Sequence, residues 1–345
     1  GMVSERGLEV LRVIVQDYVA SREPVGSKTI VDRYGFGVSA ATIRNDMAAL
    51  EEDGLIAAPH TSSGRVPTDK GYRMFVDHLH EFRPMSPAQR QAIHTFLGAG
   101  ADLDDVLGRT VRMLAQLTNQ VALVQVPVLP RSRVRHVEIV RLSATRLLVV
   151  LITDAGHVDQ RTVEIPQEGE HAGIDDEALA DLRARLNAAL VGRLLSETAP
   201  QLTDLAGSVH PARAAVVERI ATVIAEQVDD RRQDRLVMAG AANLARTEKD
   251  FPGSILPVLE AIEEQVVLLR LFSEMELDSR GVSVSIGHEN PAAGLAETSI
   301  LSGGYRSPAG ALARVGVLGP TRMDYSGNIA AVRAVARYLS KLLGD

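Results

Sequence analysis

The sequence predicts an α+β protein in which an N-terminal winged helix-turn-helix domain precedes a sheet domain that a helical insertion interrupts. Residues 4–83 hold three short helix patterns and then a hairpin pattern, which is the order of elements in a winged helix. Strand patterns at 121–165 and 282–318 enclose a stretch of helical periodicity, which indicates a sheet domain with an insertion. Pro84 and Pro87 disfavour helix in the residues before them and mark the boundary between the two parts.

Length and composition describe an ordinary globular protein. The chain has 345 residues, enough for two or three domains, and 46% of them are hydrophobic. Its apolar runs are shorter than the roughly 20 residues of a bilayer-spanning helix, and its first residues hold no apolar signal segment. We therefore expect a cytoplasmic protein without a membrane partner. The absence of cysteine excludes disulfides, thiolate catalysis and cysteine-based zinc sites.

The charge balance gives no support for nucleic-acid binding. The formal net charge is −7, and residues 1–83 carry ten basic and twelve acidic side chains, a difference of −2. DNA-binding domains usually present a basic surface. A prediction of DNA binding must therefore rest on the local arrangement of a few side chains.

Two short helices and a glycine turn are expected first. A helix is predicted over residues 5–21, and the segment from Arg22 to Gly26 ends it. Ser27 is expected to cap a second helix that reaches about Tyr34, before a Gly-Phe-Gly turn. The inward stripe of the first helix consists of Leu8, Leu11, Val15 and Val19.

The next helix, capped by Ser39 and ending near Gly54, has the composition of a recognition helix. Ile43, Met47 and Leu50 share one side and are expected in the core. Arginine pairs with guanine and asparagine with adenine through two hydrogen bonds each, and small side chains let a helix lie deep in the major groove. The opposite side offers these residue types, with Ala41, Thr42, Arg44, Asn45 and Ala48.

A wing is predicted after this helix. Two short apolar strands, near residues 55–58 and 65–68, flank a polar loop. The loop offers backbone NH groups and hydroxyls, and Arg65 stands at its base, which suits phosphates or the minor groove. Thr68 is expected to begin a further helix that runs to about Leu79. Together these elements predict a DNA-binding winged helix.

The predicted DNA contacts divide into two kinds. Arg44 and Asn45 are expected to read bases. Phosphates are assigned to Lys28, Ser39, Thr42 and Arg65. The full predicted DNA-binding set is Ser27, Lys28, Thr29, Ser39, Ala41, Thr42, Arg44, Asn45, His60, Thr61, Ser62, Ser63, Gly64 and Arg65.

The rest of the chain alternates between strand and helix patterns. Asp154-Ala155-Gly156 is a hairpin signal between two of the strands. The expected strands are 121–126, 134–142, 146–153, 157–165, 282–286, 299–305 and 311–318. The expected helices are 102–119, 175–190, 211–228, 254–274 and 325–343.

The helix expected at 211–228 is apolar enough for either of two roles. Its stripe, which includes Val216, Ile220 and Val223, is wide enough to fill a core. The same stripe could extend into a subunit interface, so both a core role and a dimer contact stay open.

Nothing in the sequence predicts catalysis. The glycine-rich residues 35–37 and 302–304 lack the strand–helix frame and the lysine of a phosphate loop. Two histidines at 78 and 80, and the pair His288-Glu289, do not provide four ligands at metal spacing. No Gly-x-Ser-x-Gly elbow accompanies the serines. We expect a protein that is not an enzyme and that holds no metal and no cofactor.

Five segments resemble the HrcA family of heat-inducible transcription repressors. Residues 59–73, Pro-His-Thr-Ser-Ser-Gly-Arg-Val-Pro-Thr-Asp-Lys-Gly-Tyr-Arg, are the most extensive of them. The other four segments are 26–29, 39–51, 286–290 and 316–325. They occur in the family's order, so the resemblance spans nearly the whole chain, although residues 166–245 carry little that matches.

The resemblance implies more than the spacing of residues does. It implies a dimeric repressor of chaperone operons that binds the inverted-repeat CIRCE operator and is kept active by the GroE chaperonin. It also implies a GAF-like domain into which a dimerisation domain is inserted. We accordingly expect the winged helix-turn-helix at 2–83, the GAF-like domain at 84–165 and 246–345, and the inserted dimerisation domain at 166–245.

A second function remains open at this point. A GAF-like domain can bind a small molecule, so the chain could instead be a metabolite-responsive regulator. A ligand that shifts the melting temperature and releases the protein from DNA would favour that alternative. An enzyme with a DNA-binding appendage has no residues to support it.

Overall fold

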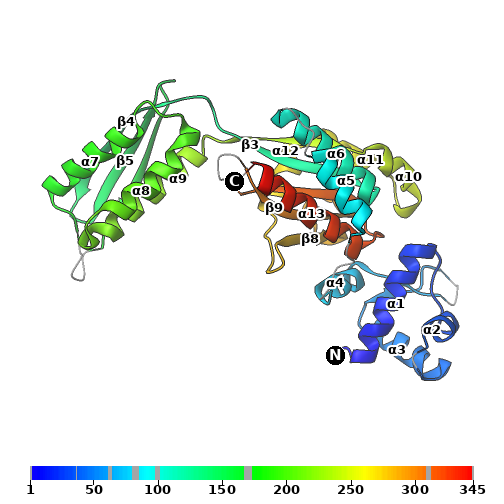
Figure 1. Cartoon of the computed structure of the whole chain (residues 1–345). Helices are drawn as coiled ribbons and strands as arrows, with labels where there is room; N and C mark the ends of the chain where they lie inside the picture. The colour runs from blue at the N-terminus through cyan, green and yellow to red at the C-terminus, as the bar shows by residue number, and fades with distance from the viewer. Residues whose placement is uncertain are drawn as a thin grey trace. The chain divides into compact units, whose positions relative to one another are not determined.

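The computed structural model of the chain describes residues 2–35, 37–60, 64–79, 85–97, 102–166, 173–307 and 312–343. The chain divides into two compact units. The main unit comprises Gly1–Val126 and Leu236–Asp345, and the inserted unit comprises Pro127–Arg235. Figure 1 labels the α-helices and several of the strands of each unit. Both helices and strands contribute to the two units, which confirms the predicted α+β class.

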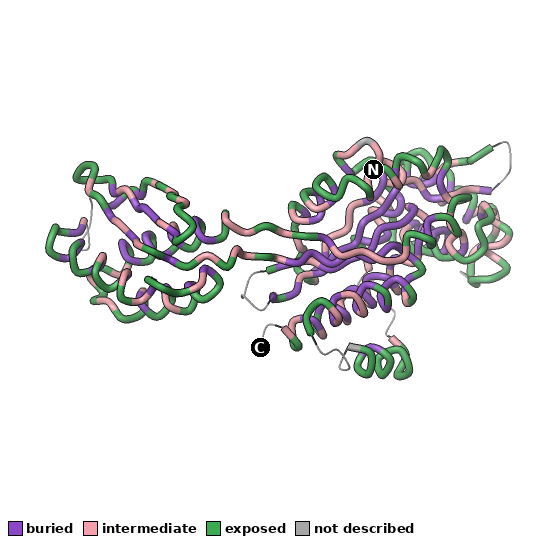
Figure 2. Tube along the Cα trace, turned by 90° about the horizontal axis from the view of Figure 1, so that it is seen from above, coloured by how far each residue is buried: buried purple, intermediate pink, exposed green. Residues whose placement is uncertain are grey.

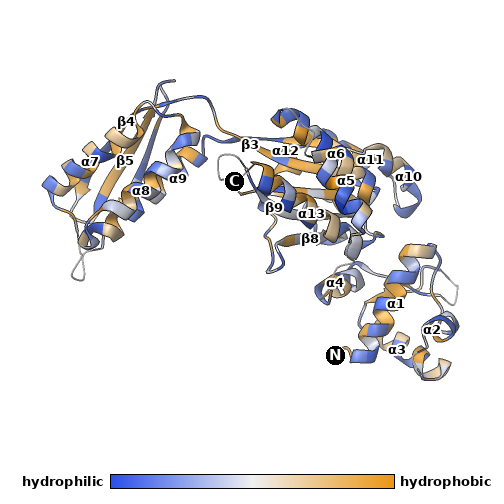
Figure 3. Ribbon diagram, viewed as in Figure 1, coloured by the Kyte–Doolittle hydropathy of each residue, from blue (hydrophilic) through white to orange (hydrophobic). Residues whose placement is uncertain are grey.

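The first part of the main unit has the element order of a winged helix. Its elements are α1 (Glu5–Ser21), α2 (Ser27–Tyr34), α3 (Ala40–Glu52), β1 (Ile56–Ala57), β2 (Val66–Pro67) and α4 (Asp69–Asp77). β1 and β2 pair antiparallel, and Val25 bridges Arg65 to extend this small sheet. The helices enclose fully buried side chains that include Ile14, Ile30 and Ile43. Hydrophobic and hydrophilic residues alternate along α1, as expected for a helix that packs one face on a core (Figure 3).

The second part of the main unit is built on a five-stranded sheet. The strand order is β7-β3-β10-β9-β8, and β10 pairs antiparallel with both β3 and β9. The strands are β3 (Val121–Val128), β7 (Gln233–Ala239), β8 (Val282–Ile286), β9 (Thr298–Arg306) and β10 (Leu312–Pro320). The helices are α5 (Pro87–Leu97), α6 (Leu103–Thr118), α10 (Ala242–Arg246), α11 (Leu256–Glu263), α12 (Gln265–Glu274) and α13 (Tyr325–Leu343). Short 3-10 turns are η3 (Glu248–Asp250), η4 (Gly287–Glu289) and η5 (Ala293–Leu295).

Helices cover both faces of this sheet. On β3, Ala122 and Val124 belong to the core that α6 and α13 share, whereas Val121 and Leu123 belong to the core that includes α12. All residues from Val121 to Val126 are therefore buried, and the sheet lies between helical layers (Figure 2). A sheet buried on both faces has largely apolar strands, which explains why β3 is hydrophobic on both of its faces, with Gln125 as its one polar residue.

The inserted unit is a three-stranded antiparallel sheet with helices packed on one face. Its strands, in the order β4-β5-β6, are β4 (Val134–Ser143), β5 (Arg146–Thr153) and β6 (Val158–Glu164). Its helical elements are α7 (Asp176–Leu190), η1 (Leu195–Glu197), α8 (Thr198–Ser208), η2 (Pro211–Arg213) and α9 (Ala214–Asp229). Leu147, Val149 and Leu151 of β5 share one core with leucines and isoleucines of α7, α8 and α9. Side chains alternate along a strand, so Leu148, Val150 and Ile152 lie on the opposite face.

The division of the chain differs from the expected boundaries at 166 and 245. The structure divides the chain at Pro127 and Arg235 instead. The strands expected to continue the GAF-like sheet, β4 to β6, pair only with one another and form the sheet of the inserted unit. Strand patterns locate strands but do not reveal which strands pair, which is why the expected boundaries and the division into compact units differ.

Several elements also differ from the expected ones. The helix expected at 254–274 is broken at Glu264, whose ψ of 68° ends α11 before α12 begins. The pattern did not predict α5, α8 or β7, and β7 is the edge strand that pairs the returning chain with β3. By contrast, α1 and α13 begin and end at the expected residues.

Of the helices in the described part of the chain, none is both long and apolar enough to cross a membrane.

Candidate nucleic-acid interface

The candidate recognition helix α3 is anchored through one side. Ser39 stands at its N-cap, and its hydroxyl accepts a hydrogen bond from the backbone NH of Thr42 at 3.3 Å. Ile43, Met47 and Leu50 are buried in the core of the domain. The predicted cap and the predicted core stripe are both confirmed. The buried side chains of Ile43, Met47 and Leu50 fix the rotation of α3 about its own axis and therefore determine which residues face outward.

The outward side of α3 is the side expected to read DNA. Ala41, Arg44, Asn45 and Ala48 are exposed, and Thr42 is half-buried. No hydrogen bond or ion pair joins the side chain of Arg44 or of Asn45 to another described residue. Both side chains are therefore free to form the paired hydrogen bonds with base edges that their chemistry permits.

Two carboxylates of α3 are held by arginines from elsewhere in the domain. Arg6 of α1 contacts both carboxylate oxygens of Asp46, at 2.7 and 3.2 Å. Arg65 contacts Glu51 at 2.8 Å. The hydrogen bond to Asp46 raises the pKa of Arg6. Pairing offsets the negative charge of these carboxylates, which would otherwise repel phosphates near the reading side.

The helix α2 begins differently from the expectation. Gly26, with extended backbone at φ −101° and ψ 160°, occupies the N-cap, and no side chain caps the helix. Ser27 is the first helical residue, so its predicted capping role is wrong. A glycine in extended conformation fills the cap position without a side chain, which moves the helix start by one residue. Lys28 is exposed, while Ser27 and Thr29 are half-buried.

The wing is anchored firmly at its base. The backbones of Val25 and Arg65 exchange two hydrogen bonds, at 2.8 and 2.9 Å. Thr68 caps α4 through the NH of Gly71 and donates its hydroxyl to the carbonyl of Gly54 at 2.6 Å, which confirms the predicted helix start. His60 at the edge of the loop is exposed.

Only part of the predicted wing lies among the described residues. Thr61, Ser62 and Ser63 lie outside the described residues. Gly64 is buried beside Pro24, where an added Cβ would lie 2.5 Å from the Cβ of that proline. Arg65 has its guanidinium on Glu51 and on the carbonyl of Gly64, so contact with a phosphate requires it to share or exchange these partners.

The residues considered for dimerisation lie in the interior of the inserted unit. Val216 and Ile220 are each 1% exposed and belong to the core beneath β4, β5 and β6. Val223 is half-buried and packs against the same core. Of the two roles left open for this helix, burial favours the core role for Val216 and Ile220, while a dimer contact through the half-buried Val223 stays a prediction.

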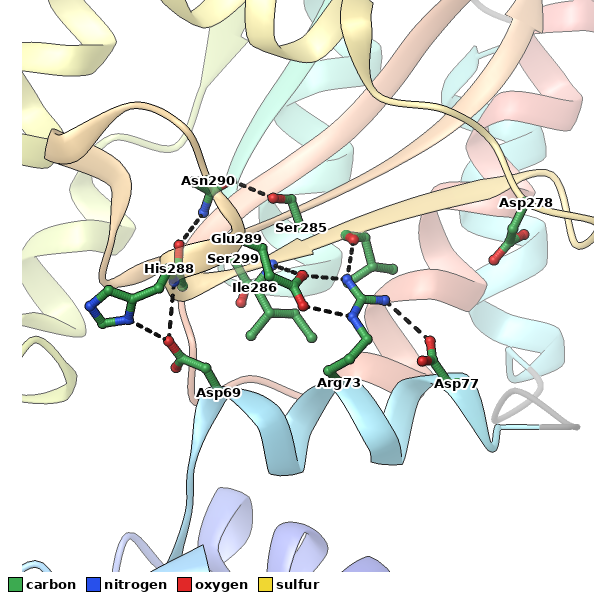
Figure 4. Close-up of polar contacts among 12 residues, drawn as sticks. Asp69, Arg73, Asp77, Asp278, Ser285, Ile286, His288, Glu289, Asn290 and Ser299 are labelled. Atoms are coloured by element: carbon green, nitrogen blue, oxygen red, sulfur yellow. Dashed lines mark hydrogen bonds and ion pairs between the residues drawn. The ribbon is translucent and has the colours of Figure 1, made fainter. Parts of the chain in front are cut away.

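The turn η4 lies against the winged helix. His288 and Glu289 of η4 contact Asp69 and Arg73 of α4, across more than 200 positions in the chain (Figure 4). In the sequence they belong to two separate motifs, at 59–73 and 286–290. Only the folded chain shows that they are partners.

Known proteins resemble this chain from end to end. The family description "HrcA protein C terminal domain" matches residues 104–329. The heat-inducible transcription repressor HrcA of Clavibacter michiganensis subsp. michiganensis is 68% identical over 344 residues, which cover 100% of both chains. That of Leifsonia xyli subsp. xyli is 62% identical with the same coverage. A crystal structure of a protein described as hypothetical is 26% identical, with a TM-score of 0.59 over 99% of this chain and 98% of that one.

Proposed function

The chain belongs to the HrcA family of heat-inducible transcription repressors, and from that premise we propose that it binds an inverted-repeat operator of the CIRCE type as a homodimer. The observation that carries this proposal is the free outward side of α3. Arg44 and Asn45 are exposed on it without a described partner, between alanines that allow close approach to base edges. The operator would lie upstream of chaperone operons, and the protein would act in the cytoplasm, where that DNA is.

Each subunit would read one half-site with α3 and hold the backbone around it. Arg44 and Asn45 would read bases, and the N-terminus of α3 at Ser39 would face a phosphate. Lys28 at the start of α2 is a second phosphate contact, because it is exposed and has no described acidic partner. The wing would reach the adjacent backbone or minor groove through Arg65 and the residues before it.

A dimer is the form that matches an inverted repeat. Two-fold symmetry of the protein then coincides with two-fold symmetry of the operator, and each subunit meets the same sequence. We assign the subunit contact to the inserted unit, on the sheet face opposite its helices. Val140 and Val158 on that face are 42% and 49% exposed. Leu142, at the end of the same strand β4, is 52% exposed. Val140 pairs with Leu148 and Val158 pairs with Ile152 of β5, which lies between their strands, and exposed apolar side chains on one sheet face support its assignment as an interaction surface.

The involvement of the GroE chaperonin rests on the family resemblance. If the chaperonin keeps the repressor active, its addition should increase the fraction of protein competent to bind DNA. A titration of active sites with and without the chaperonin and nucleotide measures this fraction directly. An unchanged fraction would contradict the chaperonin proposal and leave the DNA-binding proposal intact.

The base-reading proposal is tested by substituting Arg44. Arg44→Ala should cost about 1–3 kcal/mol of specific binding and relax the preference at one base position, because an arginine–guanine pair is lost. Fluorescence anisotropy with the operator and with single-base variants measures both effects. Arg12→Ala is the matched control, since Arg12 is also an exposed arginine, on α1, where it pairs with Glu9. Equal affinities of Arg44→Ala and the wild type would refute the role of Arg44.

A further inference from the structure

Helix α4 is tied to the turn η4 by a bidentate ion pair (Figure 4). The guanidinium of Arg73 contacts both carboxylate oxygens of Glu289, at 2.8 and 2.5 Å. It also donates to the backbone carbonyl of Val284 at 2.5 Å. Glu289 in turn accepts a hydrogen bond from the backbone NH of Ile286 at 2.8 Å. One arginine of the winged helix thereby engages both the end of strand β8 and the turn that follows it.

A second contact lies one helical turn earlier on α4. Asp69 accepts hydrogen bonds from the backbone NH of His288 at 3.1 Å and from its ring Nδ1 at 2.8 Å. The close approach requires glycine at 287, where φ is +54°. A Cβ at that position would lie 2.1 Å from the Asp69 carboxylate. We call these five residues, Asp69, Arg73, Gly287, His288 and Glu289, the α4 latch.

Two further ties reinforce the latch from other directions. Arg322, which follows β10, contacts Asp250 at 2.6 and 2.8 Å and donates to the carbonyl of Val19 at the end of α1. Arg280 donates to the carbonyl of Val76 in α4 at 3.0 Å. The winged helix is thus held at α1 and at both halves of α4, and three separated points suffice to fix an orientation.

These contacts leave the reading side of the winged helix uncovered. Every tie involves α1 or α4, whereas Arg44, Asn45 and Lys28 are exposed on α3 and α2. A contact that blocked DNA would have to cover α3. Partly exposed ion pairs add little to stability, but a bidentate arginine–carboxylate pair imposes a specific geometry. The arrangement therefore fits a device that orients the reading helix without covering it.

We infer that the α4 latch positions the winged helix on its sheet domain and thereby sets which spacing of two half-sites the dimer accepts. The inference rests on the proposed binding of an inverted repeat by a homodimer. In a dimer, the distance between the two α3 helices depends on how each winged helix is oriented on its sheet domain. A dimer with a fixed orientation binds operators of one half-site spacing, whereas a dimer with a variable orientation binds operators of several spacings. Arg73 and Glu289 are positioning residues in this account, because they act on DNA only through the orientation of α3.

The first experiment measures orientation in the full-length protein without DNA. The chain has no cysteine, so Asp32→Cys on α2 and Arg270→Cys on α12, both at exposed positions, accept spin labels at two defined sites. Dilution with unlabelled protein suppresses distances between subunits. Pulsed electron resonance should give a narrow distance distribution for the latched protein and a broader one after Glu289→Gln or Arg73→Gln. Equal widths in both would overturn the inference, whatever the DNA result.

The second experiment measures affinity against half-site spacing. Duplexes with paired half-sites, shortened or lengthened in steps of one base pair, should bind the wild type roughly tenfold less tightly away from the optimum, a typical coupling between sites. Glu289→Gln should flatten this profile while affinity for a single half-site stays unchanged. Arg73→Lys keeps the charge but not the bidentate geometry and should give an intermediate profile. Glu9→Gln is the control, since it breaks the ion pair with Arg12 within α1, 2.6 Å long, without touching the sheet domain.

The outcomes separate this inference from the function on which it rests. A wild type that binds paired and single half-sites equally would contradict the dimeric operator model. The spin-label distance distributions would still test whether the α4 latch fixes the orientation of the winged helix. A wild type with a clear optimum that Glu289→Gln preserves would overturn the latch alone. A variant that loses affinity for the single half-site as much as for the pair would assign these residues a merely structural role. Gly287→Ala provides an independent variant, because it displaces Asp69 sterically and removes no charge.

Discussion

The ion pair between Arg322 and Asp250 offers the sharpest test of how the winged helix is held. Only 12% of the Arg322 side chain and 6% of the Asp250 side chain are exposed. Two hydrogen bonds join them, and Arg322 also donates to the carbonyl of Val19. Burial alone would lower the pKa of Arg322, but its hydrogen bond with Asp250 and the charge of that carboxylate raise it. Asp250→Ala removes the carboxylate and leaves the guanidinium buried without its counter-charge.

The expected cost follows from this burial. Removal of one partner of a buried ion pair typically costs about 3–5 kcal/mol, because the remaining charge has lost its compensation. We expect the lower end, about 3 kcal/mol, since Arg322 keeps the carbonyl of Val19 as an acceptor and is slightly exposed. An exposed pair is worth much less, about 0–1 kcal/mol. Glu9 and Arg12 form such a pair, with side chains that are 52% and 46% exposed.

The assay is urea unfolding of Asp250→Ala and Glu9→Ala beside the wild type. Far-ultraviolet circular dichroism should show a much lower free energy of unfolding for Asp250→Ala and a nearly unchanged one for Glu9→Ala. The double variant Asp250→Leu with Arg322→Met should recover most of the loss, because apolar replacement removes the uncompensated charge. If Asp250→Ala and Glu9→Ala unfold at the same urea concentration, the reasoning from burial is refuted.

Three further predictions concern the latch, the core and the subunit contact. Burial by itself raises the pKa of Glu289, but hydrogen bonds from Arg73 and a backbone NH lower it overall. The latch should therefore be complete above the pKa of a glutamate in the unfolded chain, about 4.3, and be lost as pH falls through the lower pKa of Glu289 in the folded protein. The spin-label distance distribution of the wild type should then broaden in acid, while that of Glu289→Gln should not change. Ile43→Ala should cost about 2–5 kcal/mol in urea unfolding by leaving a cavity under α3, and an unchanged unfolding midpoint would contradict the core assignment. Val140→Asp should convert dimer to monomer in sedimentation velocity, and Arg185→Asp on an exposed helix face should not; a dimeric Val140→Asp would exclude the open sheet face as the contact.

The recognition helix could be predicted because its signals are local. Ser39 before the helix, Gly54 after it and the spacing of Ile43, Met47 and Leu50 all lie within one short segment. These residues determine the start, the end and the inward side of α3, and the outward side follows. The start of α2 was misplaced by one residue because glycine and serine both suit a helix cap, and sequence does not decide between them.

The pairing of strands and the latch could not be predicted because they join distant residues. β7 pairs with β3 after the whole inserted unit, and its sequence of three polar residues followed by four apolar ones gives no sign of that partner. Arg73 and Glu289 lie 216 positions apart. Each is an ordinary charged residue in its own segment, and only the packing of α4 on β8 brings them together. Long-range polar contacts of this kind carry no periodicity that a single sequence could reveal.

The acidic balance of the winged helix becomes consistent with DNA binding when its pairs are considered. The carboxylates of Asp46 and Glu51 are occupied by Arg6 and Arg65, while Arg44 on the outward side has no described partner. Such a domain has few free cations and should bind DNA of arbitrary sequence weakly. Tight binding must then come from two half-sites engaged at once, which gains affinity only if both reading helices reach them together. A DNA-binding domain with few free cations thus depends on its orientation in the dimer more than a strongly basic domain would, and the α4 latch fixes that orientation.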